Sequence, residues 1–171
     1  LEKYSDQILP AIDANGSDSA MLDNTLEFLM MNGMPLSKAV LITIPEPWKH
    51  VPLDQKEKDF YHYYASLMEP WDGPAAILFS DGQKVGAVLD RNGLRPSRYY
   101  LTSDNMLILS SEVGVLDIDE KKIVKKSRLE PGKMLLVDTK KKKLIEDYDL
   151  KNEYASSNPY GEWLDNHLLY L

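Results

Sequence analysis

The hydrophobic pattern of this chain changes at residues 71–74, Trp-Asp-Gly-Pro, and this change limits the possible folds more than any other feature. Before it, apolar residues recur at helical spacing, and after it, short apolar runs alternate with turn dipeptides such as Asp81-Gly82. Helical spacing predicts amphipathic helices, whereas short runs separated by tight turns predict antiparallel strands. Helices that precede such strands predict an α+β fold, and we expect a single domain across residues 1–171.

Helices are predicted across residues 17–70. The first one ends at Asn32-Gly33, and a second runs from Pro35 to about Ile42. The third has the clearest start, because Asp54 is an N-cap residue type and Glu57 follows three residues later, which makes a capping box.

Mostly antiparallel strands are predicted across residues 74–146, in a meander in which each strand pairs with the next along the chain. A closing helix is expected at about 159–171. The chain begins with Leu1 and ends in the apolar stretch Trp163–Leu171, whereas natural termini are more often polar. We therefore expect it to be a piece of a longer protein.

Composition excludes several classes of function. The net charge is −7, which disfavours a nucleic-acid partner, and the longest apolar run, Ala39–Ile44, is far shorter than the roughly 20 residues of a membrane span. Cysteine is absent, so these residues contain no disulfide, thiolate metal site or cysteine nucleophile. The histidines His50, His62 and His167 lack a metal-ligand spacing, and no metal site is predicted.

One candidate binding residue is Asp18, which opens a predicted helix within Gly16–Ala20. Its carboxylate could cap that helix, or it could accept hydrogen bonds from the ammonium group of a ligand. Capping is worth about 0.5–2 kcal/mol and a charge-assisted hydrogen bond about 1.5–3 kcal/mol, so energetics leave both roles open.

A second candidate segment contains three arginines between Asp90 and Arg98. Asn92-Gly93 supplies the positive φ of a tight turn, but three arginines exceed what a turn requires. We interpret the segment as a structural corner in which an arginine donates to backbone carbonyls, with anion or partner recognition as the alternative. The corner residues are Asp90, Arg91, Gly93, Arg95 and Arg98.

Five motifs resemble, in this order, the glutaminase domain of the glutamate synthase large subunit, and the resemblance covers essentially the whole chain. Several of them run eight residues or more, which makes the resemblance specific. The motifs are Gly16–Glu27 (GSDSAMLDNTLE), Met68–Ala76 (MEPWDGPAA), Leu89–Tyr99 (LDRNGLRPSRY), Ser111–Val115 (SEVGV) and Pro159–Trp163 (PYGEW).

The resemblance implies the later part of a class II glutamine amidotransferase with the N-terminal-nucleophile hydrolase fold, an αββα sandwich with antiparallel sheets. In that family an N-terminal cysteine attacks the glutamine amide, an Asn-Gly-Glu motif forms the oxyanion hole, and the ammonia goes to 2-oxoglutarate to make glutamate. This chain has no cysteine, and its Asn-Gly pairs are followed by Ser17 and Leu94. We therefore expect no catalytic residue here and no activity of the chain alone.

The resemblance also implies a role for Asp18, in the family's Ser-Asp-Ser motif, as the residue that binds the α-ammonium group of L-glutamine. FMN and an iron–sulfur cluster are expected elsewhere in the parent enzyme and not here, while the electron donor (NADH, NADPH or ferredoxin) stays open. The implied location is the cytoplasm, or the plastid in a photosynthetic eukaryote.

The implied partner is the remainder of the large subunit. Because part of a sandwich exposes apolar faces and strand edges, we also expect the isolated chain to self-associate.

The alternative function is a non-enzymatic α+β module that binds a peptide or a sugar through aromatic side chains. The candidates are Trp48, Tyr61, Tyr63, Tyr64 and Trp71. Aromatic residues at such spacings more often belong to a core or a groove edge, so the amidotransferase resemblance is favoured.

Overall fold

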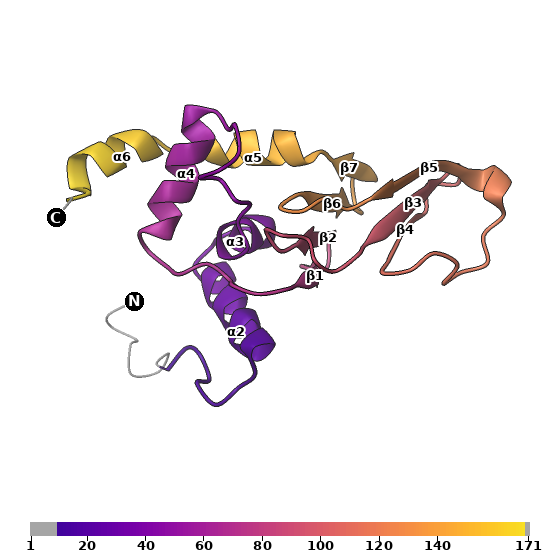
Figure 1. Ribbon diagram of the computed structural model, residues 1–171, viewed down its shortest axis with the longest axis horizontal. Coiled ribbons are helices and arrows are strands. Elements are labelled where there is room, and N and C mark those ends of the chain that lie inside the picture. The colour runs from indigo at the N-terminus through magenta and orange to yellow at the C-terminus, as the bar shows by residue number, and fades with distance from the viewer. Residues whose placement is uncertain (1–9, 170–171) are drawn as a thin grey trace. The chain divides into compact units, whose positions relative to one another are not determined.

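The computed structural model describes residues 10–169, and the chain forms two compact units, one up to Val40 and one from Leu41 on. Helices and antiparallel strands both occur (Figure 1), so the predicted α+β class is confirmed. Within the described range, no helix is long and apolar enough to cross a membrane.

The first unit contains α2 (Asp18–Met31), whose ends are fixed by local hydrogen bonds. Ser17 is the N-cap, and its Oγ accepts a hydrogen bond from the backbone N–H of Ala20 at 3.2 Å. After Asn32, Gly33 adopts φ +85°, a conformation that glycine reaches without steric cost. The predicted end of this helix is thus confirmed.

Two further helices follow close to their predicted positions. α3 spans Leu36–Thr43 and α4 spans Gln55–Ala65. The Asp54 carboxylate accepts a hydrogen bond from the backbone N–H of Glu57 at 2.9 Å, so the predicted cap is confirmed. Burial, and next the charge of Asp54, raise the pKa of Glu57.

The second unit ends in two helices, α5 (Asp147–Ala155) and α6 (Tyr160–His167), and the sequence predicts only the latter. Both contact α4 at one end of this unit (Figure 1). The rings of Phe60 on α4 and Tyr160 on α6 meet edge to face with centroids 5.4 Å apart. Residues 170–171 of the predicted closing helix lie outside the described residues.

Four antiparallel strands form the first sheet, in the order β1-β2-β6-β7. Asp81 and Gly82 turn the chain between β1 and β2 as predicted, and the Asp81 carboxylate accepts hydrogen bonds from Lys84 at 2.7 Å and Gln83 at 2.9 Å. These bonds, that from Lys84 first, lower the pKa of Asp81. The strands are β1 (Ala76–Ser80), β2 (Lys84–Leu89), β6 (Met134–Asp138) and β7 (Lys143–Ile145).

Gly86 on β2 lies directly opposite Phe79 on β1. A Cβ atom at position 86 would overlap the aromatic ring of Phe79. The glycine therefore leaves free the space that the ring of Phe79 occupies.

The second sheet has the order β4-β3-β5 and is also antiparallel. Its strands are β3 (Arg98–Thr102), β4 (Leu107–Ser110) and β5 (Ile123–Arg128), and the 3-10 turn η2 (Glu120–Lys122) precedes β5. The predicted continuous meander is therefore wrong: β2 pairs with the distant β6, and β3 to β5 form a separate sheet. Alternation of apolar residues fixes which face of a strand is buried but not which strand it pairs with.

The two sheets of the second unit share a hydrophobic core. β2 and β6 contribute Ala87, Leu89 and Leu135, and the second sheet and the turn after it contribute Tyr99 and Leu129. The corner after β2 and the turn before β6 adjoin strands that this core holds in place.

Candidate functional site

Asp18 is the first residue of α2, and its side chain is exposed. Its Oδ1 accepts a hydrogen bond from the backbone N–H of Ser19 at 2.7 Å. The capping role that the sequence leaves open for Asp18 belongs to Ser17, whose hydroxyl bonds to Ala20. The Asp18 carboxylate thus stands at the positive end of the helix dipole without being the cap.

The corner after β2 is built around the carboxylate of Asp90, which is 2% exposed. Its Oδ1 accepts from the backbone N–H of Ala75 at 3.0 Å, and its Oδ2 accepts from those of Asn92 at 3.0 Å and Gly93 at 3.1 Å. The expectation that an arginine organises this corner is therefore wrong. A short carboxylate accepts several nearby N–H groups at once, and a long guanidinium cannot accept any.

The arginines of the segment lie on its periphery. Arg91 donates to Asp72 at 2.7 Å, and since both side chains are half or more exposed, this ion pair is worth under about 1 kcal/mol. Arg95 is exposed, and Arg98 is exposed on β3. The structure thus joins Asp90, Arg91 and Gly93 in one turn, leaves Arg95 and Arg98 outside it, and places Asp18 in the other unit.

Replacing Gly93 with alanine is expected to destabilise the second unit. Gly93 has φ +58°, and a Cβ there would lie 2.5 Å from Cγ of Pro131. Gly82 is a matched control, because its φ is +85° but nothing lies within 4 Å of a Cβ at that position. Both variants place an alanine at a positive φ, which strains the backbone. Only Gly93→Ala also overpacks the turn, so its unfolding free energy should fall by about 1 kcal/mol more than that of Gly82→Ala. Urea unfolding of both variants measures this difference, and equal losses would contradict the close packing of this turn.

A buried group of charged residues was not predicted from the sequence. Lys151 on α5 is 2% exposed, and its Nζ lies 2.8 Å from Oε1 of Glu46 and 2.9 Å from Oδ2 of Asp147. The same ammonium group donates to the backbone carbonyl of Gly132 at 3.0 Å. We call Glu46, Lys133, Asp147 and Lys151 the ionic cluster. It joins the segment before α4, the turn before β6, and α5.

Neighbouring groups complete the ionic cluster. The hydroxyl of Tyr61 donates to Glu46 at 3.1 Å, and burial together with the Glu46 charge raises the pKa of Tyr61. Lys133 lies 3.3 Å from Asp147. Burial alone would lower the pKa of Lys133, but the charges of Asp147 and Glu46 raise it above its ordinary value. The one sequence signal for this cluster is the four-residue spacing of Asp147 and Lys151 on one helix face.

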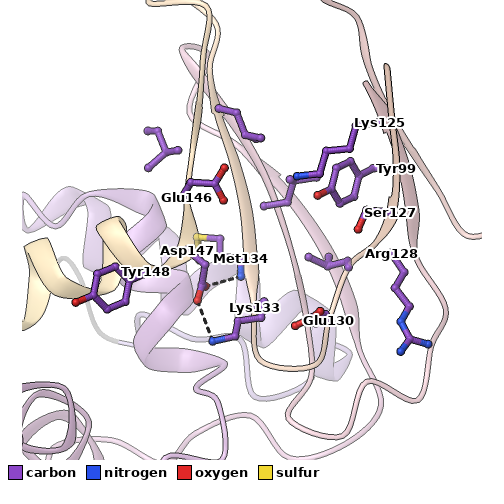
Figure 2. Close-up of a pocket in the computed structure, with 14 residues that line it drawn as sticks. Tyr99, Lys125, Ser127, Arg128, Glu130, Lys133, Met134, Glu146, Asp147 and Tyr148 are labelled. Atoms are coloured by element: carbon purple, nitrogen blue, oxygen red, sulfur yellow. Dashed lines mark hydrogen bonds and ion pairs between the residues drawn. The ribbon is translucent and has the colours of Figure 1, made fainter. Parts of the chain in front are cut away.

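A pocket of about 380 Å³ lies beside the ionic cluster, between β5 and the β6–β7 hairpin. Figure 2 shows Asp147 at its edge, bonded to the backbone of Met134 and to Lys133. The charged residues that line it are Lys125, Arg128, Glu130, Lys133, Glu146 and Asp147. The hydroxyl of Ser127 also lines it, but among the described residues no hydrogen bond joins this hydroxyl to a basic side chain, so the arrangement offers ionic contacts and no activated nucleophile.

Four of the five aromatic residues of the alternative module pack against other rings, and the fifth, Trp71, donates its indole N–H to the backbone carbonyl of Gly73 at 3.0 Å. Tyr61 is 2% exposed and stacks on Trp48, with ring centroids 6.4 Å apart. Tyr63 packs against Tyr160 and Trp163 at 5.3 and 5.2 Å. These rings do not form an open platform for a peptide or a sugar. Across residues 10–169 there is also no group of three or more histidine, aspartate or glutamate residues that could hold a metal ion.

The chain is similar to known glutamine amidotransferases and glutamate synthases. The family model described as glutamine amidotransferases class-II matches residues 1–163. The chain is 48% identical over 164 residues to the NADPH glutamate synthase large chain of Bacillus subtilis, covering 95% of this chain and 11% of that protein. It is 50% identical over 164 residues to the NADH glutamate synthase of Schizosaccharomyces pombe, covering 95% of this chain and 8% of that protein.

A plant relative shows the same degree of similarity. The chain is 50% identical over 162 residues to the chloroplastic ferredoxin-dependent glutamate synthase of Oryza sativa, covering 92% of this chain and 10% of that protein. The chain therefore spans about a tenth of the length of the curated relatives that it matches.

Proposed function

We propose, since the chain belongs to the class-II glutamine amidotransferase family, that it forms the later part of the glutaminase domain of a glutamate synthase large chain. In this proposal the domain releases ammonia from L-glutamine for transfer to 2-oxoglutarate, and the rest of the large chain is the partner of these residues. The enzyme would work in the cytoplasm, or in the plastid of a photosynthetic eukaryote.

The observation that carries the proposal is the position of Asp18. Its carboxylate is exposed at the start of α2, and the capping task there is performed by Ser17. A carboxylate in this position is available to the α-ammonium group of free glutamine, and a charge-assisted hydrogen bond of this kind contributes about 1.5–3 kcal/mol. We propose that Asp18 selects free glutamine over amides without that ammonium group.

The chemical step would use residues other than these 171. The nucleophile of the family is a cysteine, and the chain has none, so we expect it not to hydrolyse glutamine alone. An iron–sulfur cluster does not fit these residues either, because its usual ligands are cysteine thiolates. The cluster of the proposed enzyme would therefore bind elsewhere, and we propose the same for its FMN.

The test compares glutamine with glutaramic acid, which is glutamine with hydrogen in place of the amino group. Ammonia release by the full-length enzyme is measured with both substrates. Since glutaramic acid cannot bond to Asp18, its kcat/KM should be about 10- to 100-fold lower.

Two outcomes would contradict different parts of the proposal. Equal kcat/KM for the two substrates would show that the amino group is not recognised. Absence of ammonia release from glutamine by the full-length enzyme would contradict the proposed glutaminase function itself.

A further inference from the structure

The outer face of the sheet β4-β3-β5 carries a basic set of side chains. Alternate residues of a strand point to opposite faces, and Tyr99 points into the core. Arg98 and Tyr100 therefore point to the other face, together with the residues opposite them on β4 and β5. We call this set the basic face: Arg98, Tyr100, Ile108, Ser110, Lys126 and Arg128.

Two arginines of the basic face stand directly opposite each other. Arg98 pairs with Arg128 in the register of β3 and β5, and both side chains are exposed, although Arg128, at the end of β5, also borders the pocket beside the ionic cluster. Directly opposed side chains have Cβ atoms about 4.5–5.5 Å apart, and like charges at that distance destabilise a sheet. Among residues 10–169, no carboxylate forms an ion pair with either guanidinium.

Lys126 adds a third positive charge to this face. Its Nζ lies 5.8 Å from the centre of the Tyr100 ring and 3.9 Å from Oε1 of Glu120, which is 87% exposed. Such a long, solvated ion pair neutralises little charge. The basic face thus concentrates positive charge on a chain whose net charge is −7, and folding alone does not require this arrangement.

We propose that the basic face binds an acidic, extended segment of a protein partner, whose carboxylates pair with the guanidiniums of Arg98 and Arg128. Guanidinium groups bind carboxylates through two parallel hydrogen bonds, and arginine and tyrosine are, with tryptophan, enriched among the residues that contribute most to binding at protein interfaces. The face is an open sheet surface, which suits an extended segment better than a small molecule. The net negative charge of the chain opposes a nucleic acid.

This interaction goes beyond ammonia release and does not involve Asp18. In this proposal Arg98 recognises a partner. The sequence leaves this role open as the alternative to a structural corner. A carboxylate between the two guanidiniums would also relieve the repulsion between them.

The test measures binding of a fluorescein-labelled peptide of alternating glutamate and serine residues to the full chain by fluorescence anisotropy, at low salt. The variant is Arg98→Gln/Arg128→Gln. The matched control is Lys140→Gln/Lys143→Gln, which removes two exposed positive charges, one from the turn between β6 and β7 and one from the first residue of β7. We expect the arginine variant to bind at least tenfold more weakly and the lysine control to bind within twofold of the parent.

Circular dichroism and the thermal unfolding midpoint establish that both variants fold, and removal of the opposed charges should leave the midpoint of the arginine variant no lower than that of the parent. The proposal is wrong if the peptide does not bind the parent, or if both variants lose the same affinity. It is also wrong if inorganic phosphate at equal ionic strength displaces the peptide, because the face would then be a phosphate site.

Discussion

Replacing Asp18 with asparagine is expected to lower glutamine-dependent glutamate formation about 10- to 100-fold while ammonia-dependent formation continues at the parental rate. The reason is that only glutamine needs its ammonium group held, whereas added ammonia bypasses the glutaminase domain. The measurement compares the two rates in a full-length glutamate synthase whose large chain contains these residues. The kcat/KM for glutamine is the decisive quantity.

Two control variants separate substrate binding from effects on α2. Asp23→Asn removes an exposed carboxylate from the same helix and should leave both reactions unchanged. Ser17→Ala removes the cap, costs about 0.5–2 kcal/mol of helix stability, and should not alter the ratio of the two reactions. Parental rates for Asp18→Asn in both reactions, or an equal loss in both, would rule out Asp18 as the glutamine anchor.

Replacing Lys151 with methionine is expected to cost about 3–5 kcal/mol of unfolding free energy, because it leaves Glu46 and Asp147 with uncompensated charges in a buried site. Methionine keeps the unbranched shape of the side chain and lacks only its terminal ammonium group, so packing changes little. Urea unfolding followed by tryptophan fluorescence measures the loss. Trp48, Trp71 and Trp163 all lie in the second unit, so the signal reports on the unit that contains the ionic cluster.

The matched control is Lys133→Met, because Lys133 contacts the same two carboxylates at 3.3 and 3.9 Å but its side chain is 44% exposed. We expect this variant to lose under about 1 kcal/mol, since solvent screens the charge that it removes. A triple variant with Lys151→Met, Glu46→Gln and Asp147→Asn should regain part of the loss by removing the buried negative charges. Equal destabilisation by the two single lysine variants would contradict the distinction between a buried and a screened ammonium.

Features coded by neighbouring residues could be predicted from the sequence. The cap at Asp54, the end of α2 at Gly33 and the turn at Asp81-Gly82 depend on contacts within four residues, and the structure has all three. The resemblance to glutamate synthases also rests on contiguous motifs, and the comparisons confirm it. Local hydrogen-bonding chemistry and local motifs therefore identify both the elements and the family.

Features that join distant segments could not be predicted in this way. The sequence pattern does not indicate α5, because Lys151 occupies a buried position in this helix and interrupts the apolar pattern of its face. The pairing of β2 with β6 and the ionic cluster depend on which segments meet in space, and no local pattern states that. The corner shows the same limit, because local sequence does not say that Asp90 rather than an arginine makes its hydrogen bonds. The pairing of Arg98 with Arg128 likewise depends on the register of β3 and β5.

Gly86 and Phe79 show how one contact can tie the evolution of two positions together. Because the ring of Phe79 occupies the space of a side chain at position 86, a larger residue there becomes acceptable only after the ring has been lost. Loss of the ring first would uncover the backbone of β2, so neither order of substitution is neutral. The two positions therefore constrain each other, and an engineer who redesigns this hairpin must change both together.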